Sequence, residues 1–269
     1  MKIACAALLV ASLTLPAIAE TPAPRNPLTD GETWADLRGD IVGEAVIADG
    51  AALFEVDAPY RAHDAATVPI HIRQLDDSRE IESAIIVIDE NPAPLAAELS
   101  FGPSMSPLDI EVRVRVNMYS NVRVIASTEA GLAMNGRFVK ASGGCSAPAT
   151  KDPELALASM GQMRLKYFET APQMSPARRE AQIMIRHPNY SGLQRDQVTQ
   201  LFIAAHFIDR LEVFQGDDML FTMEGGISIS ENPVFRFSYS DNGTPALRVR
   251  ATDTEGNVFE QTLVKSGQI

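Results

Sequence analysis

The chain has 269 residues, of which 45% are hydrophobic and 22% are charged, and its formal net charge is -12. This composition is that of a folded protein, and the length is sufficient for two domains of ordinary size. The excess of acidic residues argues against nucleic acid and against an anionic membrane surface as partners.

The first nineteen residues have the pattern of a secretory signal peptide. Lys2 gives a positive start, residues 3–15 are almost wholly apolar, and Ala17-Ile18-Ala19 provides the small-x-small pattern of a cleavage site. The apolar run is too short and too interrupted for a membrane anchor, which needs roughly twenty apolar residues. We therefore expect residues 1–19 to be a cleaved signal peptide, and the mature protein to be exported to a bacterial periplasm and free of the membrane.

A proline-rich leader occupies residues 20–28, and a short helix is expected after it. Thr29 or Asp30 is suited to cap that helix. Its apolar residues fall on one face: Trp34, Leu37 and Ile41.

Short β-strands are expected over most of the remaining chain. Their sequences alternate apolar with polar residues or are rich in β-branched residues, and turn-forming residues separate them. In the first half these stretches are TVPIHIRQL, SAIIVIDE, IEVRVRVNMY, NVRVIAST and GRFVKA. In the second half they are MRLKYFE, AQIMIRHP, an interrupted VTQLFIAAHFI, DRLEVFQ, MLFTMEG, VFRFSYS, ALRVRATD and VFEQTLVK. In IEVRVRV, Arg113 and Arg115 are predicted to lie on a solvated face of the sheet.

The sequence predicts a mainly β protein of two β-sandwiches. We place the first sandwich at residues 29–144 and the second at residues 161–269. Residues 145–160 join them as a linker and a short helix, which Asp152-Pro153-Glu154 would begin.

One cysteine remains after the signal peptide is removed, because Cys5 leaves with it. Cys145 follows Gly143 and Gly144 and precedes Ser146, without bulky apolar neighbours. An unpaired cysteine in an oxidising compartment is either buried and inert or kept for its reactivity. The glycine and serine flanks favour a flexible loop, so we expect Cys145 to be solvent-accessible and reactive.

Other chemistry has weaker support in the sequence. Lys140 and Lys151 are the cations nearest to Cys145 in the sequence and would favour its thiolate. No Cys-x-x-Cys motif and no metal-ligand spacing occurs, and the scattered methionines are typical of core filling. His187 and His206 are more often structural, hydrogen-bonded histidines than bases or ligands. We therefore expect no catalytic residues, no metal and no cofactor.

Several stretches resemble the SoxY and SoxZ subunits of a periplasmic sulfur carrier. The SoxY-like stretches are VPIHI, IIVIDENPAP and VKASGGCS, and the SoxZ-like stretches are HPNYSGLQRD, AAHFI, GGISISENPVFRF and DTEGNVFEQTL. The chain looks like a fused SoxYZ-like carrier of the type that occurs beside quinoprotein dehydrogenases.

This resemblance implies immunoglobulin-like sandwiches and a covalent carrier thiol at Cys145. It also implies that the chain is not an enzyme, and that its partners are periplasmic sulfur-oxidising enzymes or a quinoprotein dehydrogenase. Family members usually carry Gly-Gly-Cys-Gly-Gly at a free C-terminus, whereas here Ser146 and Ala147 follow the cysteine and the fusion closes the arm into a loop. The alternative is an accessory docking module for a quinoprotein dehydrogenase, in which the thiol is secondary.

Overall fold

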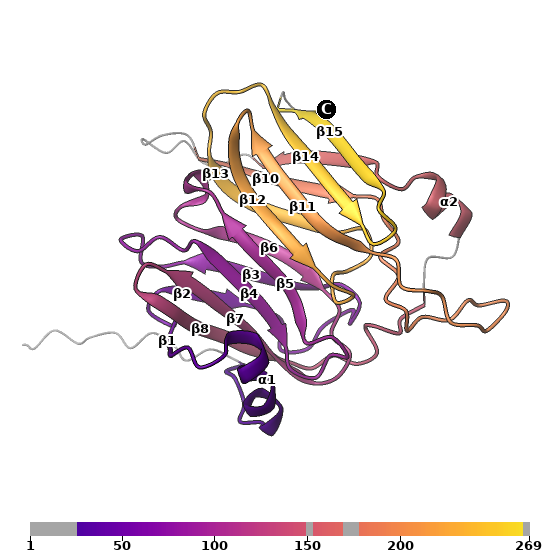
Figure 1. Ribbon diagram of the computed structural model, residues 1–269, viewed down its shortest axis with the longest axis horizontal. Coiled ribbons are helices and arrows are strands. Elements are labelled where there is room, and N and C mark those ends of the chain that lie inside the picture. The colour runs from indigo at the N-terminus through magenta and orange to yellow at the C-terminus, as the bar shows by residue number, and fades with distance from the viewer. Residues whose placement is uncertain (1–25, 149–152, 169–177, 266–269) are drawn as a thin grey trace, which may run out of the picture.

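The structure is a computed structural model that describes residues 26–148, 153–168 and 178–265. Two β-sheets make up most of it (Figure 1). The expected signal peptide and most of the leader lie outside the described residues. No helix in the described ranges is long and apolar enough to cross a membrane.

Within its described residues, the first half contains one helix, a single 3-10 turn and eight strands. These are α1 (Glu32–Val42), η1 (Pro103–Met105), β1 (Ile47–Asp49), β2 (Phe54–Asp57), β3 (Val68–Gln74), β4 (Ser83–Ile88), β5 (Leu95–Phe101), β6 (Asp109–Val114), β7 (Ser120–Thr128) and β8 (Gly131–Val139). The second half contains α2 (Pro153–Ala158), β9 (Met163–Phe168), β10 (Arg178–Ile185), β11 (Ile208–Gln215), β12 (Asp218–Gly225), β13 (Val234–Ser240), β14 (Ala246–Asp253) and β15 (Val258–Val264). The mainly β prediction is confirmed, as are both short helices.

Both sheets run through both halves of the chain. The larger sheet has the strand order β1-β8-β7-β4-β5-β12-β11-β14-β15, and the smaller has β2-β3-β6-β13-β10-β9. The halves are joined by antiparallel pairing of β5 with β12 and of β6 with β13. In Figure 1 the strands of the second half therefore continue the layers of the first.

A single hydrophobic cluster between the sheets contains buried residues from both halves. The alternation read in the sequence produces it: in β3, Val68, Ile70 and Ile72 point inward while their neighbours are more exposed. Across the join, Phe237 of β13 is in register with Ile110 of β6, and both are buried. The two sandwiches thus share one core.

Two local expectations are wrong. Gly31 precedes α1 without a side-chain cap, because Thr29 instead bonds the side chain of Asn121 through its backbone N–H and its hydroxyl. The interrupted stretch over residues 198–208 is a strand only from Ile208 onward. Before that point the stretch lies outside the two sheets and makes only isolated bridges among the described residues, Phe202 with Arg195 and His206 with Tyr190, which are too few to form a strand.

Candidate functional site

The cysteine-bearing loop follows β8 and lies against the segment after β6. The backbone N–H of Gly143 donates to the carbonyl oxygen of Asn117 at 2.8 Å, and that of Gly144 donates to Val116 at 3.1 Å. Gly143 has φ +78°, a left-handed conformation that favours glycine. At Gly144, a Cβ would lie 2.1 Å from the carbonyl oxygen of Ala65, so this glycine is required for close backbone packing.

The Cys145 side chain is buried, with an exposed fraction of 0%, and the expectation of a solvent-accessible thiol is wrong for this structure. Ser146 and Pro148 beside it are exposed. The loop therefore lies at the surface while its thiol points inward. The two glycines allow the chain to press against neighbouring backbone, which is a packing role that the sequence pattern does not distinguish from flexibility.

The second half of the chain holds this loop from the other side. The Ser191 hydroxyl donates to the carbonyl oxygen of Cys145 at 2.5 Å, and the Gln194 amide donates to that of Ala147 at 3.0 Å. Ser191 and Gln194 are themselves buried. The cysteine loop thus lies at the junction of the two halves and is bonded to both.

Arg115 is the cation that acts on the thiol, and sequence reasoning missed it. It was expected on a solvated face, but only 1% of it is exposed, because the second half covers the end of β6. The alternating sequence indicates that Arg113 and Arg115 point to the same face, but it does not indicate which segment covers that face. Burial raises the pKa of the Cys145 thiol, and the Arg115 guanidinium opposes that rise.

Lys140, one of the two lysines proposed from the sequence, lies over aromatic rings instead. The Lys140 ammonium lies over the ring of Tyr60, 4.7 Å from its centroid, and 5.9 Å from that of Tyr119. Lys151 lies outside the described residues. The cation beside the thiol therefore comes from a strand thirty residues earlier, a contact that no spacing in the sequence indicates.

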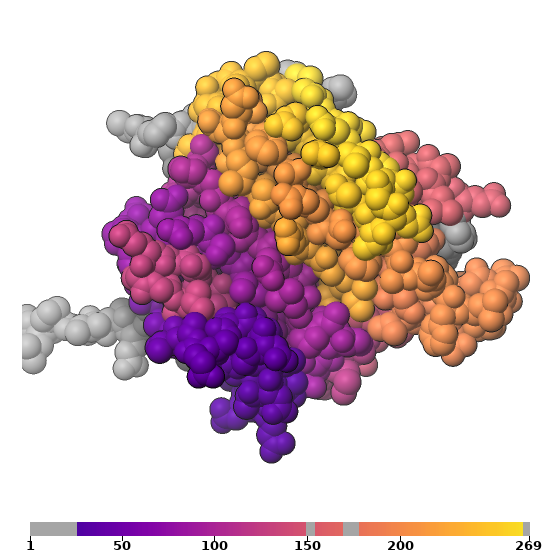
Figure 2. Space-filling view, viewed as in Figure 1, coloured from indigo at the N-terminus to yellow at the C-terminus, as the bar shows by residue number. Residues whose placement is uncertain are grey.

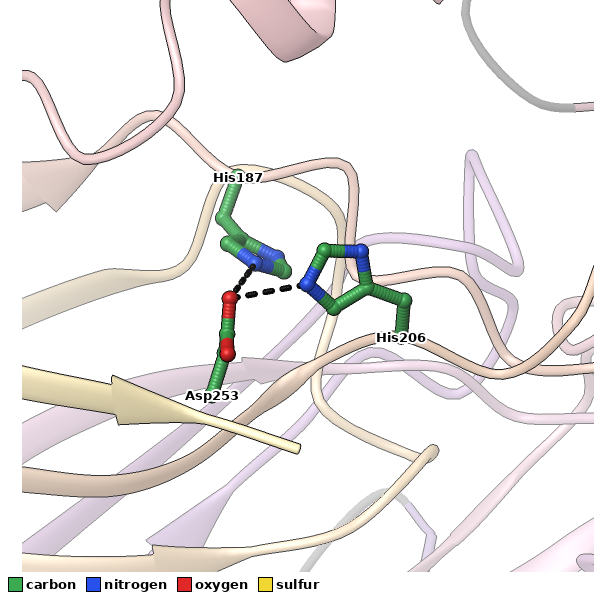
Figure 3. Close-up of side chains that lie close together, drawn as sticks. All are labelled: His187, His206 and Asp253. Atoms are coloured by element: carbon green, nitrogen blue, oxygen red, sulfur yellow. Dashed lines mark hydrogen bonds and ion pairs between the residues drawn. The ribbon is translucent and has the colours of Figure 1, made fainter. Parts of the chain in front are cut away.

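A buried cluster of His187, His206 and Asp253 lies in the second half (Figure 3). Both histidine Nε2 atoms approach the same carboxylate oxygen, at 3.4 Å and 2.8 Å respectively. The hydrogen bonding expected of these histidines is confirmed, whereas the part played by Asp253 was not expected from the sequence. The hydrogen bonds to Asp253 lower its pKa to about 2, although burial alone would raise it.

The cluster also supports the segment that holds the cysteine loop. The backbone N–H of Asn189 donates to Nδ1 of His187 at 3.0 Å, and Asn189 binds Ser230 and Ile208 through its side chain. Ser191, two residues later, bonds Cys145. The cluster is therefore connected to the cysteine loop through one short segment.

Three ligand atoms of this cluster lie within 4.8 Å of one another, which is compatible with a metal site. The hydrogen bonds argue otherwise. Because Nδ1 of His187 accepts a backbone N–H, its Nε2 carries the proton and has no lone pair for a metal. Asp253 accepts from both histidines and from the backbone and side chain of Asn257. The donor set is thus better suited to hydrogen bonding than to a cation.

A projecting segment flanks the site. The residues between β10 and β11 extend beyond the body of the molecule, as the orange lobe in Figures 1 and 2. Their exposed apolar side chains include Val198, Leu201 and Phe202. A surface hollow next to the cysteine loop is lined by Ser146, Pro148, Leu193, Arg195, Asp196, Gln197 and Gln200. This segment therefore forms part of the surface around the cysteine loop.

Comparison with protein families gives two matches in tandem. The family model described as sulfur oxidation protein SoxY matches residues 38–145. The model described as sulphur oxidation protein SoxZ matches residues 170–264. No curated protein matches the sequence.

Solved structures give more distant similarity. The sulfur carrier protein SoxY from Chlorobium limicola f thiosulfatophilum is 23% identical over 40% of this chain and 96% of its own, with a TM-score of 0.34. A superoxide reductase (neelaredoxin) from Ignicoccus hospitalis is 10% identical over 39% of this chain and 90% of its own, with a TM-score of 0.29. The expected association with a quinoprotein dehydrogenase stays a prediction, since neither family model bears on it.

Proposed function

The chain joins a SoxY-like domain to a SoxZ-like domain and is a fused SoxYZ-like protein of sulfur oxidation, and we propose that it carries a sulfur intermediate covalently on Cys145. In this proposal the protein is exported to the periplasm and presents the intermediate to sulfur-oxidising enzymes. It supplies a thiol and no catalytic residues of its own.

One observation carries the proposal. The SoxY match ends at residue 145, so the single cysteine that remains after the signal peptide stands at the last position of that domain. A thiolate is the most nucleophilic side chain available to form a sulfur–sulfur bond. Its position at the junction also leaves both halves free to form the docking surface for a partner.

The burial of Cys145 requires that the loop opens during the cycle. Opening breaks the backbone bonds of Gly143 and Gly144 and the side-chain bonds from Ser191 and Gln194. If Lys140 remains fixed, the released cysteine is five residues further along and reaches roughly 16 Å at about 3.3 Å per residue. Because the fusion closes the arm, the loop enters a partner as two strands and needs a wider site than a free terminus would.

The intact mass of protein purified from its native host tests this function. We expect mass increments of sulfur-containing adducts that a reductant removes, and we expect Cys145→Ala protein to carry none. The same increments on Cys145→Ala, or an unmodified wild-type protein under sulfur-oxidising growth, would contradict the carrier function. Circular dichroism of Cys145→Ala provides the folding control.

A further inference from the structure

Arg115 is a buried cation without a carboxylate partner. Its Nη1 donates to the carbonyl oxygens of Ile229 at 2.5 Å and Ile227 at 3.3 Å, while its buried Nε has no hydrogen-bond partner among the described residues. No ion pair joins it to a carboxylate in the described part of the chain. Burying an unpaired charge costs roughly several kcal/mol even after the surrounding protein relaxes. A nearby anion would therefore stabilise the buried guanidinium.

The backbone brings Cys145 beside this cation. Gly144 bonds Val116, and the residue before Gly144 bonds the residue after Val116, so the two segments run in opposite directions. Arg115 directly precedes Val116 and Cys145 directly follows Gly144, so the hydrogen bond between Gly144 and Val116 brings the two residues close along the backbone. The thiol and the guanidinium accordingly interact electrostatically, and each is buried.

We propose that Arg115 is the counter-ion of an anionic sulfur group on Cys145. The group is the charged end of a short adduct on the loaded protein, such as a persulfide or a sulfonate-terminated sulfur. This inference rests on the proposed carrier function and narrows its cargo to anionic sulfur species, because a neutral adduct would leave the buried guanidinium unpaired.

The surrounding charges fit this assignment. Burial lowers the pKa of Arg115, and Cys145 acts against that effect more strongly than Glu231 does. Burial raises the pKa of Glu231, so this carboxyl is a poor competitor for the guanidinium, although Arg115 partly opposes the rise. An anion carried on the Cys145 sulfur would therefore meet little competition from Glu231 for the guanidinium.

Two reagents place adducts of different charge on the same sulfur. With tetrathionate, the thiolate attacks an inner sulfur, the central S–S bond breaks, and thiosulfate leaves, so that Cys145 carries S–S–SO3⁻. With methyl methanethiosulfonate, the thiolate displaces methanesulfinate and Cys145 carries a neutral S–S–CH3. Mass spectrometry confirms complete conversion, since the mature chain has one cysteine.

We expect the anionic adduct to melt a few degrees above the neutral one, as a gain of about 1 kcal/mol would produce in a protein of this size. The difference should disappear in Arg115→Gln and remain in the control Arg113→Gln, whose half-exposed side chain lies near Glu111 at 3.6 Å. Equal melting of the two wild-type adducts, or a difference that persists in Arg115→Gln, would overturn the proposal. The difference in melting temperature between the two adducts of the wild-type protein tests the proposal even if Arg115→Gln does not fold.

Thiolate absorbance at 240 nm gives a second readout that needs no reagent. With Cys145→Ala subtracted, we expect the titration midpoint of folded Arg115→Gln to lie at higher pH than that of the wild type, and that of Arg115→Lys to stay closer to it. An unchanged midpoint would mean that Arg115 has a structural role and does not stabilise the thiolate. Because both readouts use synthetic adducts or the bare thiol, they can succeed or fail independently of whether native adducts are found.

Discussion

At the scale of single residues, the packing of the cysteine loop depends on the absence of a Cβ atom at Gly144. A Cβ on Gly144 would meet the carbonyl oxygens of Ala65 at 2.1 Å and Val116 at 2.7 Å. Both are backbone atoms, which cannot rotate away as a side chain does. The buried position of Cys145 therefore depends on the absence of a side chain one residue earlier.

We predict that Gly144→Ala exposes Cys145. The added methyl group should displace the loop and lower stability by about 1–3 kcal/mol, the usual cost of overpacking. Iodoacetamide should then label the native variant much faster than the wild type. Ser146→Ala is the matched control, since the hydroxyl of this exposed neighbour makes a long bond of 3.4 Å to Gly143, and removing the hydroxyl should leave labelling slow. Equal labelling rates in Gly144→Ala and wild type would show that the loop accommodates the methyl group.

At the scale of elements, the segment between β10 and β11 connects the histidine cluster to the cysteine loop. Its first residues are held by His187 and Asn189, and Ser191 bonds Cys145. Burial lowers the pKa of His187 below 6.5, against the effect of Asp253. In contrast, His71 on β3 has a raised pKa because it hydrogen-bonds Asp109.

The two histidines predict opposite dependence of stability on pH. A lowered folded pKa means that the unfolded chain takes up a proton first, so the contribution of His187 is present above pH 6.5 and is lost as the pH falls below it. The raised pKa of His71 gives stability that is present below pH 6.5 and is lost as the pH rises through its folded pKa.

Urea unfolding at pH 7.5 and pH 5 can separate these effects. Relative to wild type, His187→Gln should lose less stability on acidification, and His71→Gln should lose more. The lowered pKa of Asp253, about 2 against 3.8, adds a loss of stability below pH 3.8, outside this window. Identical pH dependence in wild type and His187→Gln would contradict the assignment of a buried neutral histidine.

At the scale of the whole molecule, the two halves behave as one folded body. Each sheet crosses the boundary, with five residue pairs between β5 and β12 and three between β6 and β13. The covalent connection over residues 149–152 lies outside the described residues, and the contacts just described do not involve it.

We predict that the halves remain together after the chain is cut at an engineered protease site at Thr150. The shared core and sheets should hold them, since a linker raises effective concentration without adding contacts. The cut protein should co-elute on gel filtration at micromolar concentration. Phe237→Ala removes a buried side chain at the join, at a cost of about 3–5 kcal/mol, and should promote separation only after cutting. Independent elution of the unsubstituted halves would contradict a common core.

The class of fold and the position of most strands follow from local patterns in the sequence. Alternating residues in β3 and β13, and turn residues between strands, are local signals that need no knowledge of neighbours. The sequence also identified the lone cysteine at the junction of two domains. It missed β5, whose alanines have weak strand preference and which pairs with β4 on one side and β12 on the other.

Only the tertiary structure decided what surrounds the thiol. Alternation in β6 showed that Arg113 and Arg115 share a face, but the second half covers one and leaves the other half-exposed. Cys145 is buried for the same reason, since Ser191 approaches it from 46 residues away. His187 and Asp253, 66 residues apart, likewise meet through packing. Sequence periodicity encodes which side chains point the same way, whereas burial, and with it the pKa of a thiol or histidine, depends on which distant segment closes over them.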